Sequence, residues 1–231
     1  LTEDYYVANK LMKGFVGSAN MDTNSRLCMA SAVVAHKRAF GSDTVPGCYE
    51  DLEAADLLVL VGSNTAWAHP IVYQRIAAAK AARPEMKIVV IDPRRTATCD
   101  IADLHLPIRP GSDTLLFNGL LRYLHNERAT DEAFLQQHCE GWETTLDATQ
   151  YDEQLAQTIG VTPSALAQFF YCFKETPRTV TVFSQGVNQS RDGSDKANAI
   201  INVHLATGRI GKPGACPFSI TGQPNAMGGR E

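Results

Sequence analysis

The sequence predicts an α/β fold, a layered α/β/α domain whose sheet is mostly parallel and Rossmann-like. The apolar run at 57–61 has the length and continuous hydrophobicity of a strand buried on both faces, and 87–91 and 179–183 are predicted as further strands. A helical pattern at 70–82 separates the first two runs, so they form a βαβ unit with a right-handed crossover. Strand and helix patterns then alternate along the chain, which is typical of a parallel sheet between two layers of helices.

Local signals set the ends of several predicted elements. A helix is expected at 29–40, ending at Gly41, because glycine is favoured just after the last helical turn. Pro70 lies near the start of the 70–82 helix, and Thr162 is placed to cap a helix at 163–174. The remaining predicted elements are a strand at 104–108, helices at 113–126, 131–138, 151–159 and 194–207, and a polar loop at 184–192.

Size and charge narrow the classes of function. The 231 residues are 44% hydrophobic, which is enough for a substantial core. The formal charge of −4, without a run of Lys or Arg, argues against nucleic acid or an anionic membrane as the main partner. The longest aliphatic run, 57–61, is far too short to span a bilayer, so no direct membrane contact is expected.

The six cysteines are scattered along the chain, with neither a Cys-x-x-Cys pair nor the spacing of a zinc site. This pattern suits a reducing compartment, and we predict a cytoplasmic protein. The sequence starts at Leu1 without a signal-type apolar segment, and it stops within an apparent loop. We therefore expect these residues to be an internal piece of a longer polypeptide.

Cys28 is the cysteine with the most polar surroundings. It follows a run of amide, carboxyl and hydroxyl side chains at 20–26, and Arg26 is two positions away. The expected helix start would put Cys28 within the first turn or so, where free N–H groups and the helix dipole favour a thiolate. Such a thiolate is a candidate metal ligand. The alternative is a small buried cysteine that only packs in the core.

Polar loops follow four of the predicted strands, at 62–67, 92–96, 110–113 and 185–189. Loops at the carboxyl ends of parallel strands are where such sheets bind ligands. Small residues there let backbone N–H groups approach phosphates, and a carboxylate can bind a ribose or a purine edge. The glycine fingerprint of ordinary dinucleotide binding is absent. Taken singly, each loop also has the composition of a plain turn or a solvated surface.

Six segments carry a resemblance to a known family, and they lie at 24–31, 62–70, 91–96, 111–113, 186–189 and 221–231. In these segments, and over nearly its whole length, the chain resembles the catalytic subunits of the molybdopterin oxidoreductases. The likeness is greatest to the bacterial assimilatory nitrate reductases. In this family two molybdopterin guanine dinucleotides hold one molybdenum, and a protein side chain adds a ligand.

The resemblance implies a role for each matching residue. Cys28 would be the molybdenum ligand, with Met29 and Arg26 beside it at the catalytic centre. Asp113 and Asp92 would contact the guanine and the ribose. The full set of residues implied to contact the dinucleotides is Asn24, Gly62, Ser63, Asn64, Thr65, Trp67, Asp92, Pro93, Arg94, Arg95, Thr96, Gly111, Ser112, Asp113, Gln185, Gly186, Asn188 and Gln189.

The implied activity is nitrate assimilation, in which an oxygen atom passes from nitrate to reduced molybdenum to give nitrite. An electron-donor protein or subunit would then restore the metal. The cysteines that hold the family's 4Fe-4S cluster do not occur in this sequence, so the cluster would belong to the longer protein. Residues 1–179 would form the central α/β domain that binds the dinucleotides, and 180–231 would begin a second, discontinuous α/β domain. Alone, the chain is expected to be inactive.

Other functions stay open at this point. Formate dehydrogenases and periplasmic nitrate reductases have the same fold, but in formate dehydrogenases a histidine follows the metal ligand, whereas Met29 follows Cys28 here. A non-catalytic domain of the same fold would be expected to lose Cys28 and its neighbours. A plain nucleotide-binding module is disfavoured by the missing glycine fingerprint.

Overall fold

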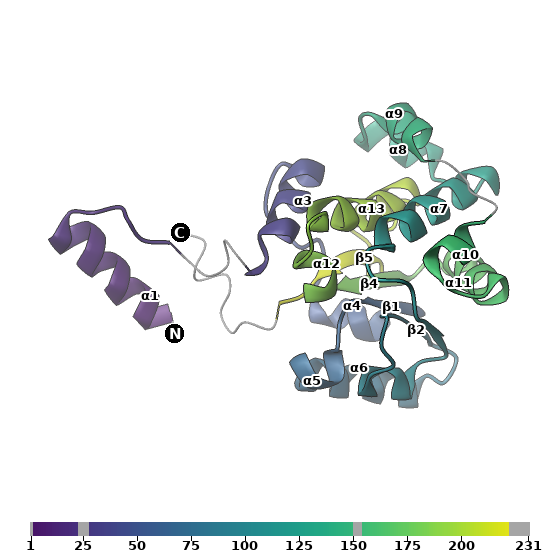
Figure 1. The fold of residues 1–231 in the computed structure, drawn as a ribbon, viewed down its shortest axis with the longest axis horizontal. Coiled ribbons are helices and arrows are strands. Elements are labelled where there is room, and N and C mark those ends of the chain that lie inside the picture. Colours follow the sequence, from purple (N-terminus) through teal and green to yellow (C-terminus); the bar gives the residue numbers. More distant parts are fainter. Residues whose placement is uncertain (1, 23–27, 150–153, 222–231) are drawn as a thin grey trace.

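The computed structural model describes residues 2–22, 28–149 and 154–221. Residues 28–149 and 154–221 fold around one parallel sheet, and α1 lies away from it (Figure 1). The strand order is β3-β2-β1-β4-β5, and every neighbouring pair is parallel. The strands are β1 (Leu57–Val61), β2 (Lys87–Ile91), β3 (Leu104–Leu106), β4 (Thr179–Phe183) and β5 (Cys216–Ser219). The α/β fold class predicted from the sequence is confirmed.

Helices cover both faces of the sheet. In Figure 1, α3, α7 and α13 lie on one face, while α4, α5 and α6 lie on the other. The helices are α1 (Thr2–Asn9), the π-helix η1 (Lys10–Val16), α3 (Ala30–Phe40), α4 (Tyr49–Ala54), α5 (Thr65–Ala68), α6 (Pro70–Ala82), the 3₁₀ helix η2 (Ala97–Ile101), α7 (Asp113–Asn126), α8 (Glu132–His138), α9 (Trp142–Ala148), α10 (Leu155–Ile159), α11 (Pro163–Glu175), α12 (Gln185–Asn188) and α13 (Gly193–Ala206).

The central strand β1 shows why its sequence is apolar throughout. Leu57, Val59 and Val61 pack into the core shared with α7 and α13, whereas Leu58 and Leu60 pack into the core shared with α4 and α6. Successive side chains of a strand point to opposite faces, so a strand covered on both faces buries all of them. All five residues of β1 are buried.

Several predicted boundaries are confirmed at the level of single contacts. The helix α3 ends at Phe40, and Gly41 follows it with a left-handed φ of 74°. The Thr162 hydroxyl accepts a hydrogen bond from the Ala165 N–H at 3.2 Å, as expected of a cap. Helix α6 and strands β1, β2 and β4 have the bounds that the sequence predicts.

The structure also corrects some predictions. The third strand ends at Leu106 rather than at 108, because Pro107 has no N–H to continue the ladder. The expected polar loop at 184–192 contains the short helix α12. Strand β5 was not predicted. It is an edge strand that contains Pro217, and proline is tolerated mainly at edges. The first residues of the helix expected at 151–159 lie outside the described part.

Strand β4 spans the predicted domain boundary at residue 179. It pairs with β1 on one side and with β5 on the other, so residues 180–183 and 216–219 belong to the same sheet as β1. The predicted division into two domains, at 1–179 and 180–231, therefore stays a prediction.

The last two observations on the fold are the state of the cysteines and the lengths of the helices. All six cysteines are free thiols. Within residues 2–22, 28–149 and 154–221, no helix is both long enough and apolar enough to cross a bilayer.

Candidate functional site

The candidate site lies at the carboxyl ends of β1 and β4, where the strand order reverses direction. From β1 the chain continues into α5 and α6 on one face, and from β4 it continues into α12 and α13 on the other (Figure 1). Because these connections diverge, they leave room at the carboxyl ends of β1 and β4. Open α/β sheets usually bind their ligands at this position.

Two glycines let the loops after β1 and β4 approach each other closely. The Gly186 N–H donates to the Gly62 carbonyl at 3.0 Å. A Cβ on Gly186 would lie 2.6 Å from the Gly62 Cα, and Gly62 itself has a left-handed φ of 54°. A side chain at either position would force the two backbones apart, so both positions require glycine.

A cavity of about 390 Å³ opens beside this crossing. It has the size of a site for one small molecule. Seven residues predicted from the sequence line it, namely Gly62, Asp92, Pro93, Arg94, Gly111, Asp113 and Gly186. The loops after β1, β2, β3 and β4 therefore contribute to one cavity, as their positions at strand ends predicted.

The two carboxylates of the cavity are held by different contacts. Asp92 follows β2, and its Oδ1 accepts a hydrogen bond from the Arg94 N–H at 2.9 Å. Asp113 is the first residue of α7, where the helix dipole favours a negative charge. Its Oδ2 lies 3.0 Å from the Nζ of Lys196. Asp92 and Asp113 are both buried residues, and the side chain of Asp113 is 11% exposed.

Lys196 is the main feature of the cavity that the sequence analysis missed. It lies in the first turn of α13, is 3% exposed, and is also 3.6 Å from Asp192 Oδ1. The i,i+4 spacing of Asp192 and Lys196 was visible in the sequence, but such pairs usually lie on solvated helix faces. The polar lining residues Arg109, Ser190 and Asp192 were also missed.

Cys28 lies next to α12, where side-chain amides face its sulfur. The Gln185 Nε2 donates to Cys28 Sγ at 2.8 Å, and the Gln189 Nε2 lies at 3.5 Å from it. Asn188 Nδ2 donates to the Gln185 Oε1 at 3.3 Å, which fixes the Gln185 amide with its N–H groups toward the sulfur. Two donors directed at one sulfur suit a thiolate acceptor, because a thiol is itself a weak donor.

The helix expected at 29–40 begins one residue later than predicted. Helix α3 begins at Ala30 with Met29 as its N-cap, so Cys28 precedes the helix. Met29 is 4% exposed. In the described part of the chain, the side-chain amides of Gln185 and Gln189 therefore contact the sulfur.

The start of α3 packs against the loop after β4, although the two segments are far apart in sequence. The Ser31 hydroxyl donates to the Asn188 carbonyl at 2.7 Å. A Cβ on Gly193 would lie 2.6 Å from both the Asn188 carbonyl oxygen and the Ser31 Oγ. This close packing holds Cys28 beside Gln185.

Cys216 gives a contrast within the same chain. It is buried in the core shared with α4 and α6, and burial raises the pKa of its thiol to about 12. Such a cysteine is an inert packing group. Cys28 differs because it is half-buried and meets polar side chains.

Several other residues of the predicted site do not line the 390 Å³ cavity. Thr98 Oγ1 donates to Asn64 Oδ1 at 3.1 Å, and the Ser63 and Thr65 hydroxyls contact each other at 3.0 Å. These three residues thus stabilise the loop after β1. Trp67 is 78% exposed, so it packs neither in the core nor over the cavity.

The remaining predicted site residues have simpler outcomes. Ser112 is the buried N-cap of α7, while Arg95 and Thr96 do not line the cavity. Asn24 and Arg26 lie outside the described residues. Their implied roles stay predictions.

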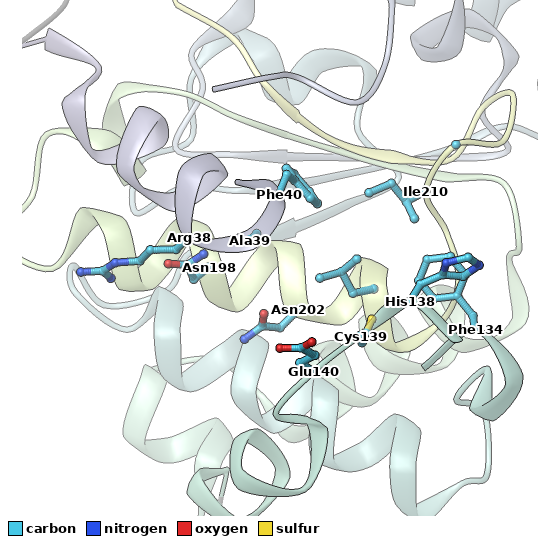
Figure 2. A pocket seen from close by; sticks show the side chains of 12 residues that line it. Arg38, Ala39, Phe40, Phe134, His138, Cys139, Glu140, Asn198, Asn202 and Ile210 are labelled. Carbon is cyan, nitrogen blue, oxygen red and sulfur yellow. The ribbon is translucent and has the colours of Figure 1, made fainter. Parts of the chain in front are cut away.

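A larger cavity, of about 770 Å³, lies elsewhere in the domain (Figure 2). Arg38 and Phe40 of α3, Asn198 and Asn202 of α13, and Glu140 after α8 surround it. None of the predicted site residues lines it. In the part of the chain that the structure describes, no group of three or more His, Cys, Asp or Glu side chains is arranged to hold a metal ion.

Comparison with known proteins decides the family. The sequence model of the molybdopterin oxidoreductases matches residues 1–230. The chain belongs to the molybdopterin oxidoreductase family. Among solved structures, acetylene hydratase from Pelobacter acetylenicus superposes with a TM-score of 0.68 over 88% of the chain and 26% of its own length. At 22% identity this neighbour supports the fold alone.

Curated relatives within the molybdopterin oxidoreductases are nitrate reductases. The chain is 58% identical to the nitrate reductase of Klebsiella oxytoca and 47% identical to that of Synechocystis, in each case over its whole length. It is 40% identical to the periplasmic nitrate reductase of Desulfovibrio desulfuricans over 99% of its length. The chain spans 26%, 32% and 32% of these relatives respectively.

Proposed function

We propose that this chain is the part of a molybdenum-dependent nitrate reductase that binds the nucleotide portion of a bis(molybdopterin guanine dinucleotide) cofactor and supplies a thiolate to its metal. The observation that carries the proposal is the position of Cys28. Its sulfur faces the amides of Gln185 and Gln189, from the loop after β4, whose Gly186 also lines the cavity.

The donor set fits such a cofactor. A thiolate is a soft ligand that suits a soft metal, and Cys28 is placed to provide it. Asp92 and Asp113 offer buried carboxylates for a ribose and a purine edge. The close crossing of Gly62 and Gly186 brings the backbone of both loops to the wall of the cavity, where backbone N–H groups can bind phosphate. When bound, the cofactor supplies the redox centre at which nitrate loses an oxygen atom and becomes nitrite.

Nitrate is the substrate best supported among those of the family. The relatives at 58% and 47% identity are named nitrate reductases. The residue after Cys28 is the buried, apolar Met29, which has no proton to exchange, whereas formate oxidation by the family's formate dehydrogenases would use a histidine there. An electron-donor protein and a 4Fe-4S cluster bound by the longer polypeptide complete the proposal. Six free thiols support a cytoplasmic location.

The experiment changes Cys28 to serine in a polypeptide of the relatives' length. If Cys28 is the metal ligand, Cys28→Ser should leave the fold intact, alter the electron paramagnetic resonance signal of molybdenum, and abolish nitrate reduction with reduced viologen as donor. The matched control is Cys172→Ser, which changes a half-buried cysteine of α11 away from the cavity. An unchanged signal with full turnover in Cys28→Ser would remove this residue from the mechanism.

A further inference from the structure

Lys196 is a buried cation in a position that helix energetics disfavours. It lies in the first turn of α13, where the positive end of the helix dipole repels a positive charge. It is only 3% exposed, and a buried ammonium requires a partner of opposite charge. Its nearest partner is Asp113 Oδ2 at 3.0 Å, from a different helix, and the second is Asp192 Oδ1 at 3.6 Å.

The ion pair between Lys196 and Asp113 forms part of the cavity wall. Both residues line the 390 Å³ cavity, together with Gly62 and Gly186. Lys196 engages Oδ2 of the carboxylate, while Oδ1 of Asp113 has no hydrogen-bond donor among residues 2–22, 28–149 and 154–221. The carboxylate is therefore fixed on one oxygen and available on the other.

We propose that Lys196 is a positioning residue that holds Asp113 as a charged acceptor, and that this pair selects guanine over adenine at the nucleotide end of the cofactor. The inference rests on the proposed function, in which Asp113 contacts the nucleotide. It adds a residue, Lys196, and assigns to the ion pair the choice between two bases.

Hydrogen-bond chemistry explains the selection. The edge of guanine presents two neighbouring N–H donors, which match the acceptors of an ionised carboxylate. The edge of adenine presents one N–H donor beside a ring nitrogen that is an acceptor. A carboxylate held in the same place would therefore set one of its oxygens against this ring nitrogen, and two acceptors repel each other. The choice depends on the carboxylate staying charged and in place.

The ammonium of Lys196 supplies both conditions. It compensates the negative charge of Asp113 in a site that is almost closed to water, where an unpaired carboxylate is unfavourable. It also fixes the orientation of the carboxyl group through Oδ2. Without this charge, Asp113 is expected to turn away from its position in the cavity wall, and the preference for guanine should fall.

The test measures binding of GDP and of ADP to the 231-residue chain by isothermal titration calorimetry. The variants are Lys196→Met, Lys196→Gln, Lys196→Arg and Asp113→Asn. The control is Lys174→Met, because Lys174 pairs with Glu127 at 3.0 Å between α11 and the end of α7 and does not line the cavity. Circular dichroism checks that each variant is folded. If Lys196→Met does not fold, Lys196→Gln, which retains a hydrogen-bond donor, carries the test.

The expected result is a preference of about tenfold or more for GDP over ADP in the unchanged chain, since a hydrogen bond to a charged group is worth about one to two factors of ten. The preference should fall to about threefold or less in Lys196→Met, Lys196→Gln and Asp113→Asn. Lys196→Arg should retain most of it, and Lys174→Met should retain all of it.

Two other results would overturn the inference in different ways. If Lys196→Met and Lys196→Gln keep the full preference while Asp113→Asn loses it, the nucleotide site stands and Lys196 is only a structural partner. If the unchanged chain shows no preference, or Asp113→Asn binds GDP as the unchanged chain does, the proposed role of Asp113 fails, and the inference fails with it.

Discussion

At the scale of single residues, His204 shows how a buried polar group is kept neutral. It lies on α13 with its Nε2 2.8 Å from the Thr181 hydroxyl of β4 and its Nδ1 3.2 Å from the Arg209 carbonyl. Phe173 packs edge-on against the ring. Burial lowers the pKa of His204 to about 3, and the positive charge of Arg209 acts in the same direction. The neutral ring therefore links α13 to the sheet.

This lowered pKa predicts a pH dependence of stability. In the unfolded chain a histidine takes up its proton near pH 6.5, whereas folded His204 resists protonation down to about pH 3. The unfolded state binds more protons in this window, so the His204 contribution is fully present above pH 6.5 and is lost as the pH falls toward 3. Between these two pKa values, His204 alone should make the unfolding free energy rise by about 1.4 kcal/mol per pH unit.

Denaturant unfolding between pH 7 and pH 4 tests the effect. Glutamine retains a donor and an acceptor but does not titrate. His204→Gln should therefore reduce the slope of the unfolding free energy against pH by about 1.4 kcal/mol per pH unit, which corresponds to one proton. His138→Gln is the matched control, because His138 is exposed. Equal slopes for the unchanged chain and His204→Gln would show that His204 is protonated in the folded state.

At the scale of elements, the loops after β1 and β4 cross with their backbones in close contact. We expect Gly186→Ala to destabilise the domain by about 1–3 kcal/mol, because the added Cβ would meet the Gly62 backbone at 2.6 Å. Gly14→Ala is the control, since a Cβ at Gly14 in η1 meets nothing closer than 4.0 Å and alanine favours the helix. The midpoint of urea unfolding measures both changes, and equal stability of Gly186→Ala and the unchanged chain would contradict the prediction.

The elements that sequence patterns predicted well are those with a strong local cause. Strand β1 is apolar throughout, β2 and β4 are rich in β-branched residues, and α6 has Pro70 at its start. Strand β5 lacked such a signal. Its four residues include Pro217, and its place in the sheet depends on pairing with β4, which is distant in sequence. Helix α12 is a single turn, too short for any periodicity to show.

The candidate site was predictable to the extent that its residues follow strands. Asp92, Gly111 and Gly186 could be placed because carboxyl ends of parallel strands meet at one edge. Lys196 could not, because the burial of a lysine depends on a carboxylate from another helix. Trp67 shows the reverse case. The sequence put it beside a polar loop, but nothing local determines which side of the four-residue helix α5 faces solvent.

At the scale of the whole molecule, the chain provides only part of an enzyme's binding surface. It spans about a quarter to a third of the nitrate reductases it matches. A cavity of about 390 Å³ suits one small ligand and is too small for two dinucleotides. Under the proposed function, the other contacts to the cofactor come from residues outside this cavity.

We therefore expect the 231-residue chain alone to form no nitrite from nitrate with reduced viologen, whereas a polypeptide of the relatives' length should do so. Nitrite released per folded molecule is the measurement, and the Cys28→Ser variant of the longer polypeptide sets the background. Turnover by the isolated chain above that background would show that the site is complete without the rest. Formate oxidation without nitrate reduction by the longer polypeptide would instead favour a formate dehydrogenase.

The separation of Cys28 and Gln185 by 157 positions has a consequence for biogenesis. During synthesis the segment from β1 to β3 emerges first and can pair locally, since β2 and β3 follow β1 closely. The pairing of β1 with β4 closes a much longer loop and is entropically later. The sulfur of Cys28 thus meets its amide donors only after the chain as far as α12 has left the ribosome. Under the proposed function, this domain is ready to receive its cofactor only once β4 has joined β1.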